Sequence, residues 1–190
     1  MKYLFVVLIS FCFCLETVKT EDTEIKQDAI VEIRESQIPG AGMGLYAKKN
    51  IPKDSVVTDY KGKKVTKEEY NQIHAKKEHW YMFTMPECAN EPNYPYIDGD
   101  RNHFASKVNF APSEINGKPT NLQNVYFLKH CDEPYIRLYA SRDIKKGEEL
   151  FVSYGGIYDY HFMQFKEVQD FFLKKTGIKI GPKEKFTFKD

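Results

Sequence analysis

The sequence predicts one small domain of the mainly β, α+β class. Short strand-like segments are separated by turns rich in glycine and proline, and only two segments carry helix signals. Aromatic residues reach 15% of the 190 residues, and aromatic rings pack well on the pleated surface of a sheet. A chain of this length suits a single hydrophobic core.

The first half of the chain combines predicted strands with one glycine-rich segment. Residues 30–33 alternate in polarity, as an edge strand does. Thr66 and Glu69 form a capping box, which predicts a helix from Lys67 to about Glu78. The apolar positions of this helix are sparse, so we expect it on the surface. We predict a glycine-rich loop over Ile38–Gly44, strands over Leu45–Ala47, Val56–Tyr60, Trp80–Met85 and Tyr94–Ile97, and a turn at Asp98–Asp100.

The second half predicts a strand pair, a further strand and a longer helix. The pair is Val125–Leu128 with Ile136–Ala140, and the further strand is Leu150–Tyr154. Residues 111–120 are predicted as a polar loop. The helix spans 158–175, where apolar residues recur at helical spacing, with Gly177 as its C-terminal cap.

The N-terminal residues 1–20 have the pattern of a secretory signal peptide. Lys2 precedes the apolar run Tyr3–Leu15, which is too short to span a bilayer comfortably. A short interfacial anchor or an incorrect start site is the alternative. Residues 21–29 are predicted to be a polar linker. Export would place the protein in the secretory pathway or outside the cell, with no membrane span in the mature chain, and otherwise we expect a nuclear or cytoplasmic protein.

The charge and the cysteine content limit which ligands we expect this protein to bind. The net charge is +1, from 28 basic and 27 acidic residues, so we expect no direct nucleic-acid binding. Cys88 and Cys131 remain once the signal peptide is removed, and the sequence leaves their pairing open. The sequence has no CxxC pair, and its five histidines lack metal-ligand spacing, so we expect no metal site.

Several segments resemble, in order, the motifs of the SET-domain protein methyltransferases. Gly42–Ala47 resembles G-x-G-L-x-A, and Asp59–Gly62 resembles E-Y-x-G. Tyr96–Gly99 is similar to the I-D-A/G strand end, as in the PR-like branch of the family. Lys107–Ala111 falls where the family has R-F-I/V-N-H-S. Tyr139–Gly155 closely resembles the final block, A-x-R-D-I-x-x-G-E-E-L-x-x-x-Y-G, and is the most specific match.

The resemblance implies a SET-domain β-clip fold of several short sheets with a surface helix and a C-terminal helix. Residues 30–160 would form the SET-like domain, and residues 161–190 the C-terminal helix and basic tail. The implied activity is S-adenosyl-L-methionine-dependent protein-lysine N-methyltransferase, a transferase that acts on a lysine-containing histone or non-histone protein or peptide. The open alternatives are an inactive SET-like module that binds a peptide or protein, and a secreted structural domain that binds neither cofactor nor peptide.

The resemblance also assigns residues to the implied site. Glycines suit a donor loop, because they let the backbone approach a ligand and tolerate positive φ. The family's catalytic tyrosine corresponds to Tyr154, whose hydroxyl would lie beside the transferred methyl group and the amine. Phe110 replaces the usual His, and Ser106-Lys107 replaces the R-F pair. The expected roles are catalytic for Tyr154 and Tyr81, cofactor-binding for Gly42, Met43, Gly44, Asn109, Phe110 and Tyr154, and channel-lining for Tyr96, Phe83 and Val152.

Overall fold

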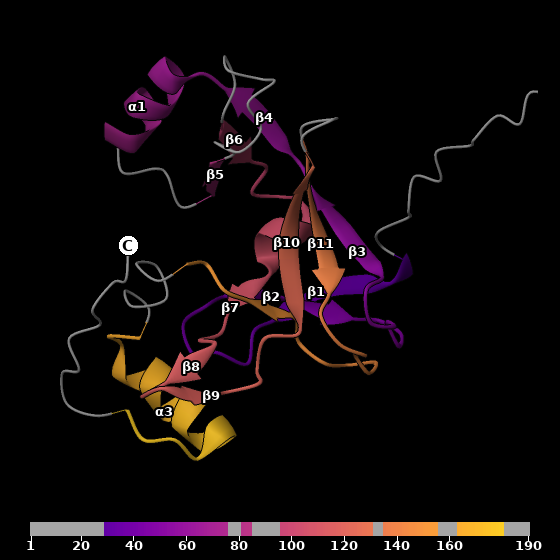
Figure 1. Cartoon of the computed structure of the whole chain (residues 1–190), viewed down its shortest axis with the longest axis vertical. Coiled ribbons are helices and arrows are strands. Elements are labelled where there is room, and N and C mark those ends of the chain that lie inside the picture. Colours follow the sequence, from indigo (N-terminus) through magenta and orange to yellow (C-terminus); the bar gives the residue numbers. More distant parts are fainter. Residues whose placement is uncertain (1–28, 76–80, 85–95, 131–134, 156–162, 181–190) are drawn as a thin grey trace, which may run out of the picture.

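The computed structural model describes residues 29–75, 81–84, 96–130, 135–155 and 163–180 (Figure 1). The expected signal peptide, Cys88, Cys131 and the last ten residues of the basic tail lie outside the described residues. None of the described helices is long and apolar enough to cross a membrane.

The described chain is mostly β structure, which confirms the predicted fold class. Its strands are short and form small separate sheets. The antiparallel sheets are β1 (Val31–Glu35) with β2 (Met43–Ala47); β10 (Val125–His130), β11 (Tyr135–Ala140) and β3 (Val56–Tyr60); β4 (Gly62–Val65), β6 (Tyr96–Gly99) and β5 (Met82–Thr84); and β8 (Glu114–Ile115) with β9 (Lys118–Pro119). The strands β7 (Asn109–Phe110) and β12 (Phe151–Val152) pair in parallel.

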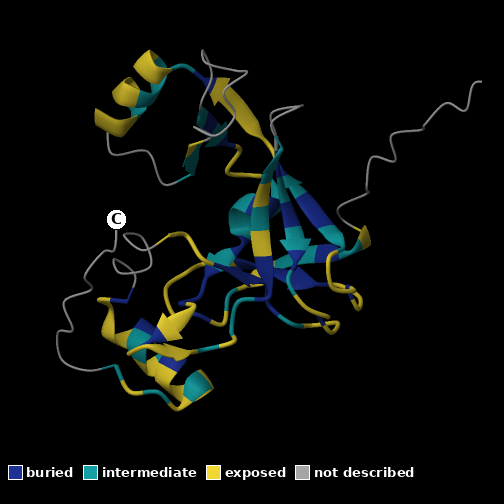
Figure 2. Cartoon of the chain, viewed as in Figure 1, coloured by how far each residue is buried: buried dark blue, intermediate teal, exposed yellow. Residues whose placement is uncertain are grey.

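The sheets surround a central core, with a helix at each end of the view. Helix α1 (Lys67–Ala75) and the β4-β6-β5 sheet lie at the top of Figure 1, and α3 (Lys166–Thr176) lies at the bottom beside the β8–β9 hairpin. Buried residues gather in the middle, around β1, β2, β3 and β11 (Figure 2). The main cluster is apolar and includes Leu45, Val57, Leu138, Ile144 and Leu150. A second cluster, around Phe110, Phe151 and Phe172, joins α3 to β7 and β12.

The predicted surface helix begins at its capping box. The Thr66 backbone N–H donates to the Glu69 carboxylate at 2.8 Å, and the Glu69 backbone N–H donates to the Thr66 hydroxyl at 3.2 Å. Helix α1 contains no buried residue, which confirms the expectation of a surface helix.

The C-terminal helix is shorter than predicted. It begins at Lys166, and Met163, Gln164 and Phe165 lie before it in non-helical backbone. Its C-terminal cap is confirmed: Gly177 has φ +71°, and its N–H donates to the Leu173 carbonyl at 2.8 Å.

Several predicted boundaries were wrong because distant partners extend or replace the local pattern. Gly44 pairs with Arg34 of β1, so β2 starts inside the predicted loop. Gly99 pairs with Gly62, so β6 continues into the predicted turn. The strand β12 ends at Val152, two residues before Tyr154. The predicted loop over residues 111–120 contains the β8–β9 hairpin.

Candidate functional site

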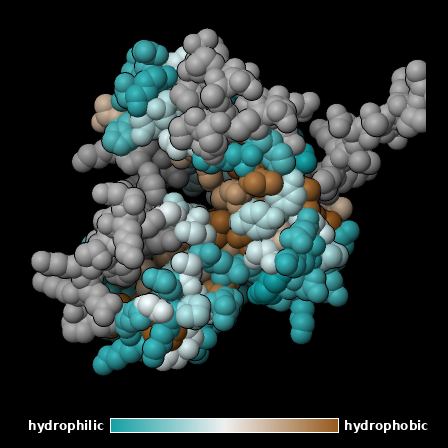
Figure 3. Space-filling view, in the orientation of Figure 1, coloured by the Kyte–Doolittle hydropathy of each residue, from teal (hydrophilic) through white to brown (hydrophobic). Residues whose placement is uncertain are grey.

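A cavity of about 1000 Å³ lies between the β5 region, the segment from η2 (Phe104–Lys107) to β7, the loop before β2, and the start of α3. Apolar surface gathers near the middle of the molecule in the region of β10 and β11 (Figure 3). Each wall of this cavity comes from a different part of the chain. Six of the predicted site residues line it: Met43, Tyr81, Phe83, Asn109, Phe110 and Tyr154.

The first wall is the loop before β2. Ile38, Ala41 and Met43 line the cavity. The loop closes on itself, since the Ser36 N–H donates to the Gly42 carbonyl at 2.8 Å. Gly42 has φ +72°, a conformation that favours glycine, as predicted for this position. Of the Gly42-Met43-Gly44 motif, Met43 is the residue that faces the cavity.

Gly44 is small for a reason that the sequence does not reveal. A Cβ added at Gly44 would lie 2.3 Å from the Oε1 atom of Glu149 and 3.2 Å from the Nδ2 atom of Asn109. The space beside Gly44 is therefore filled by the protein's own carboxylate and amide groups. Its membership of the cofactor site stays a prediction.

Glu149 is a buried carboxylate that the sequence reasoning missed. Its side chain is 2% exposed. It accepts hydrogen bonds from the Ser36 hydroxyl at 2.6 Å, the Gln37 N–H at 2.8 Å and the Asn109 amide at 3.2 Å. The Tyr46 hydroxyl lies 2.9 Å from it and also donates to the Glu35 carbonyl at 2.8 Å. The G-E-E-L sequence gave no signal that separates Glu149 from Glu148, and Glu149 lies before β12 in an isolated bridge to Tyr46.

Tyr154 and Asn109 are brought to the same cavity. The Tyr154 hydroxyl donates to the Val108 carbonyl at 2.6 Å. Asn109 donates through Nδ2 to the Met43 carbonyl at 3.2 Å and to Glu149. The ring of Phe110 also reaches the cavity wall, 6.1 Å from the Tyr154 ring, although Phe110 is only 4% exposed.

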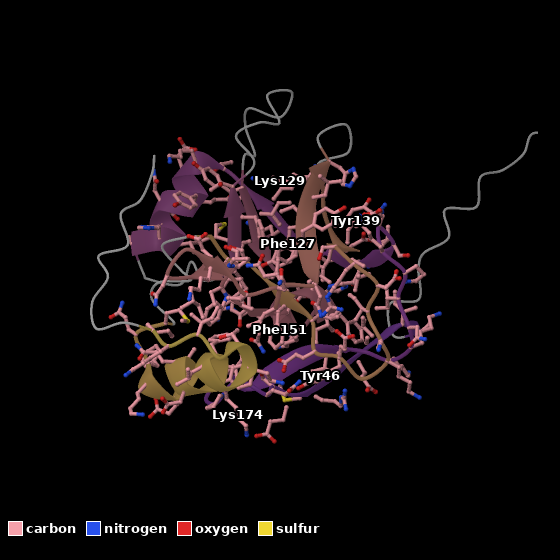
Figure 4. All side chains as sticks on the ribbon, turned by 60° about the horizontal axis from the view of Figure 1, so that its bottom comes forward. Tyr46, Phe127, Lys129, Tyr139, Phe151 and Lys174 are labelled. Atoms are coloured by element: carbon pink, nitrogen blue, oxygen red, sulfur yellow. The ribbon has the colours of Figure 1, made fainter. Side chains whose placement is uncertain are left out.

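The opposite wall is aromatic. Phe83 packs edge-on against Tyr60 and Phe127, with ring centroids 4.7 Å apart in both pairs. The Tyr60 hydroxyl donates to the Tyr81 carbonyl at 2.7 Å. Burial, and then the nearby Tyr154, raise the pKa of Tyr60 well above its usual value, so this phenol stays neutral. Phe127 and Lys129 follow each other on one face of β10, and Phe151 lies close to α3 (Figure 4).

The start of α3 completes the cavity. Phe165, Glu167 and Val168 line it, with Lys107 and Lys129 on other walls. Helix α3 thus both lines the cavity and packs against the β7–β12 pair. Its inner face buries Val168 and Phe172 against Phe110 and Phe151.

Two predicted channel residues lie away from the described cavity wall. Tyr96 stacks on Tyr70 with centroids 4.1 Å apart, and its hydroxyl accepts from the Lys67 ammonium at 2.9 Å. Val152 is 3% exposed and belongs to the central core. Of the predicted channel set, Phe83 lines the cavity, as does the predicted catalytic Tyr81. Among the residues described, no group of His, Cys, Asp and Glu side chains forms a metal site.

Comparisons with known proteins identify the class. Residues 42–155 match the SET domain family, and this stretch covers more than half of the chain. The chain therefore belongs to the SET domain family. A search of curated proteins found no match.

Similar solved structures are Polycomb Repressive Complex 2 assemblies of Chaetomium thermophilum. A humanized mutant bound to the inhibitor GSK126 matches with TM-score 0.51 and 25% identity, over 66% of this chain and 15% of that chain. The same mutant bound to GSK343 gives TM-score 0.52 and 25% identity, with the same coverage. The complex with H3K27me3 and H3K27M gives TM-score 0.51 and 26% identity, over 66% of this chain and 14% of that chain. The chain thus spans about 15% of the length of these relatives.

Proposed function

We propose that this protein is an S-adenosyl-L-methionine-dependent protein-lysine N-methyltransferase. The observation that carries the proposal is one cavity into which the β2 loop, Asn109, Tyr154 and an aromatic wall all project. Membership of the SET domain family supports a methyltransferase-type domain. The cofactor and the substrate lysine are the proposed steps beyond that membership.

The residues present fit the cofactor. The cavity volume of about 1000 Å³ lies at the upper end of the usual range for ligand sites, roughly 300–1,000 Å³. The Asn109 amide nitrogen is occupied by Met43 and Glu149, so its carbonyl oxygen is the atom it can offer to the ammonium group of the methionine part. Phe165 and Val168 offer apolar contact from α3.

In this proposal, Tyr154 orients the reacting amine. When bound, S-adenosyl-L-methionine would supply a sulfonium methyl group to a neutral lysine amine. The new N–C bond would form in line as the C–S bond breaks, and the bonding pair would leave with the sulfur as a neutral thioether. The Tyr154 hydroxyl proton is directed to the Val108 carbonyl, so the lone pairs of its oxygen can accept an N–H of that amine. Alignment of this kind lowers the barrier without acid or base chemistry at the methyl carbon.

The aromatic wall suits both the neutral lysine amine that reacts and the cationic methylated product. A lysine amine has a pKa of about 10.4 in water, and an apolar site lowers that value because burial disfavours the charged form. Neutral Tyr60, with Phe83 and Phe127, supplies such surroundings. The methylated product is cationic, and aromatic faces attract cations. We propose a lysine-containing histone or non-histone peptide as the substrate class.

A cofactor titration tests the proposal. We expect the purified chain to bind S-adenosyl-L-methionine in a calorimeter and to add mass to lysine peptides in steps of about 14 Da, the mass that each methyl group adds. Tyr154→Phe is expected to lower kcat by on the order of 10²-fold or more, because it removes the aligning oxygen. Tyr126→Phe is the matched control, since Tyr126 is exposed on β10 and stacks on Tyr139.

The outcomes separate the alternatives. A chain that binds no S-adenosyl-L-methionine refutes the enzyme proposal. Peptide binding without methyl transfer, unchanged in Tyr154→Phe, supports an inactive SET-like binding module instead.

We also propose that residues 1–20 direct export, on the pattern of Lys2 and the apolar run Tyr3–Leu15. A reporter fused to residues 1–25 is expected to reach the culture medium. Retention of the reporter inside the cell would reject export and favour a nuclear or cytoplasmic protein.

A further inference from the structure

We propose that Glu149 is a positioning residue that fixes Asn109 and the loop before β2 in their cofactor-binding arrangement. This inference rests on the proposed function, because it concerns the same cavity. Glu149 is not among the residues that line the cavity. It would therefore act on a ligand only through the groups that it holds.

Both carboxylate oxygens of Glu149 contact the loop before β2, and one of them also contacts Asn109. Oε1 accepts from the Ser36 hydroxyl and the Asn109 amide, and Oε2 accepts from the Gln37 N–H and the Tyr46 hydroxyl. A single atom, Oε1, thus joins the loop to Asn109. The Ser36 oxygen also accepts from the Ile38 N–H at 3.1 Å, so the constraint reaches Ile38, which lines the cavity.

All four donors are neutral groups that face a buried charge. A buried carboxylate is stable only when its oxygens are hydrogen-bonded. Hydrogen bonds to an ionised acceptor are roughly twice as strong as neutral ones. Three such bonds, from Ser36, Gln37 and Asn109, converge on one side chain that is 2% exposed, so these donors are held more firmly than loop groups in water. The Tyr46 hydroxyl divides its single proton between Glu149 and the Glu35 carbonyl.

Glu149 is itself fixed from two further directions. The Asn124 amide donates to the Glu149 backbone carbonyl at 2.9 Å, and Glu149 forms a β-bridge with Tyr46. On the other side, the missing side chain of Gly44 leaves room for Oε1, since a Cβ there would lie 2.3 Å from it. The carboxylate therefore serves as a fixed point against which the Asn109 amide is oriented.

The orientation of the Asn109 amide decides what it can bind. With Nδ2 directed to Glu149 Oε1, its Oδ1 is left to accept from a ligand cation. In Glu149→Gln, an NH2 group with two N–H donors replaces an oxygen to which neighbouring donors already point. We expect this change to let the Asn109 side chain rotate and the loop loosen.

The test compares Glu149→Gln with the matched control Glu148→Gln. Glu148 is the preceding residue, but it pairs with Arg142 at 2.7 Å, in a part-exposed contact separate from the cavity walls. We expect Glu149→Gln to weaken S-adenosyl-L-methionine binding about tenfold, as loss of one charge-assisted hydrogen bond does, with KM for the cofactor raised and kcat little changed. Glu148→Gln should leave both values unchanged.

A double-mutant cycle with Asn109→Ala tests whether Glu149 acts through Asn109. Positioning through both groups predicts that Glu149→Gln in the Asn109→Ala background loses less than it does alone, with the remaining loss coming through the loop. Losses that simply multiply would overturn the claim that Glu149 orients Asn109.

An NMR readout needs no cofactor, so it separates this inference from the proposed function. The Asn109 side-chain amide resonances are expected to move in Glu149→Gln and to stay in place in Glu148→Gln. Unmoved Asn109 resonances would overturn the inference. Absence of cofactor binding in the unsubstituted chain would instead overturn the proposed function.

Ser36→Ala keeps the inference testable if Glu149→Gln fails to fold. This variant retains the buried carboxylate and removes one donor to Oε1. We expect faster hydrogen exchange at the Ile38 N–H, which loses its acceptor, and weaker cofactor binding by several-fold, on the order of one neutral hydrogen bond. Unchanged exchange at Ile38 and unchanged affinity would refute the proposed coupling.

Discussion

Replacement of Phe110 by His would restore the residue that the family pattern has at this position. Phe110 is 4% exposed and packs edge-on against Phe172 of α3, with centroids 5.5 Å apart. An imidazole in this place would lie among the apolar side chains of the C-terminal cluster, which also includes Phe151. We therefore expect Phe110→His to destabilise the domain.

The expected loss follows from two contributions. An aromatic pair is worth about 0.5–1.5 kcal/mol beyond its buried area. A buried polar group without a partner costs about 1–3 kcal/mol. Together these predict that Phe110→His lowers the free energy of unfolding by about 2–4 kcal/mol. Phe110→Leu loses the ring pair but buries no polar group, so we expect it to lose only about 1 kcal/mol.

The pH dependence separates the two variants. In Phe110→His, burial would lower the pKa of the introduced imidazole below the unfolded value of about 6.5. As pH falls through about 6.5, the unfolded state binds a proton that the folded state excludes, so Phe110→His should lose further stability in acid. The Phe110→Leu variant should not share this acid loss.

Urea unfolding at pH 8 and pH 5.5 measures both effects. The reasoning is refuted if Phe110→His is as stable as the unsubstituted chain at both pH values. That result would mean that the imidazole turns from the C-terminal cluster toward the cavity, where water or a ligand satisfies it.

Three further perturbations test the interior around Glu149. Gly44→Ala places a Cβ 2.3 Å from Glu149 Oε1. By the usual cost of overpacking, we expect the free energy of unfolding in urea to fall by about 1–3 kcal/mol. An unchanged urea midpoint would show that the carboxylate has room to move. Asn124→Ala leaves the Phe151 N–H and the Glu149 carbonyl without their buried partner. We expect this variant to lose about 2–4 kcal/mol of unfolding free energy in the same assay. A loss below about 1 kcal/mol would contradict this expectation. Burial, and then the hydrogen bond to Glu149, raise the pKa of Tyr46 to about 12, whereas an unfolded Tyr titrates near pH 10. Stability should thus fall between pH 10 and pH 12, as the unfolded state releases its proton first, and Tyr46→Phe should show a smaller fall over that range.

Local sequence signals predicted the parts of the fold that depend on neighbouring residues. The capping box joins Thr66 to Glu69, three residues away, and the Gly177 cap bonds to Leu173, four residues away. Such contacts are fixed by residue type and spacing alone. The predicted pairing of β10 with β11 was confirmed for the same reason, because the two strands follow each other along the chain.

The rest of the site depends on contacts between distant segments, which periodicity does not encode. Ser36 and Glu149 are 113 residues apart, and Asn109 and Glu149 are 40 apart. No local pattern distinguishes Glu149, which is buried, from Glu148, which forms a part-exposed ion pair. Tyr154 and Asn109, which the family motif named, line one cavity, but the motif gave no indication that Tyr96 stacks on Tyr70 instead of lining that cavity.

Phe110, the most evident departure from the family pattern, has a physical role in this chain. Its ring lies between Tyr154 at 6.1 Å and Phe172 at 5.5 Å, so it joins the proposed catalytic tyrosine to the C-terminal helix. The same helix brings Phe165 and Val168 to the cavity wall. An imidazole would pack less well against Phe172, because it is smaller and must satisfy two ring nitrogens. Phe at this position therefore suits the packing of α3. Its apolar ring, which departs from the motif, contacts the helix that lines the cavity.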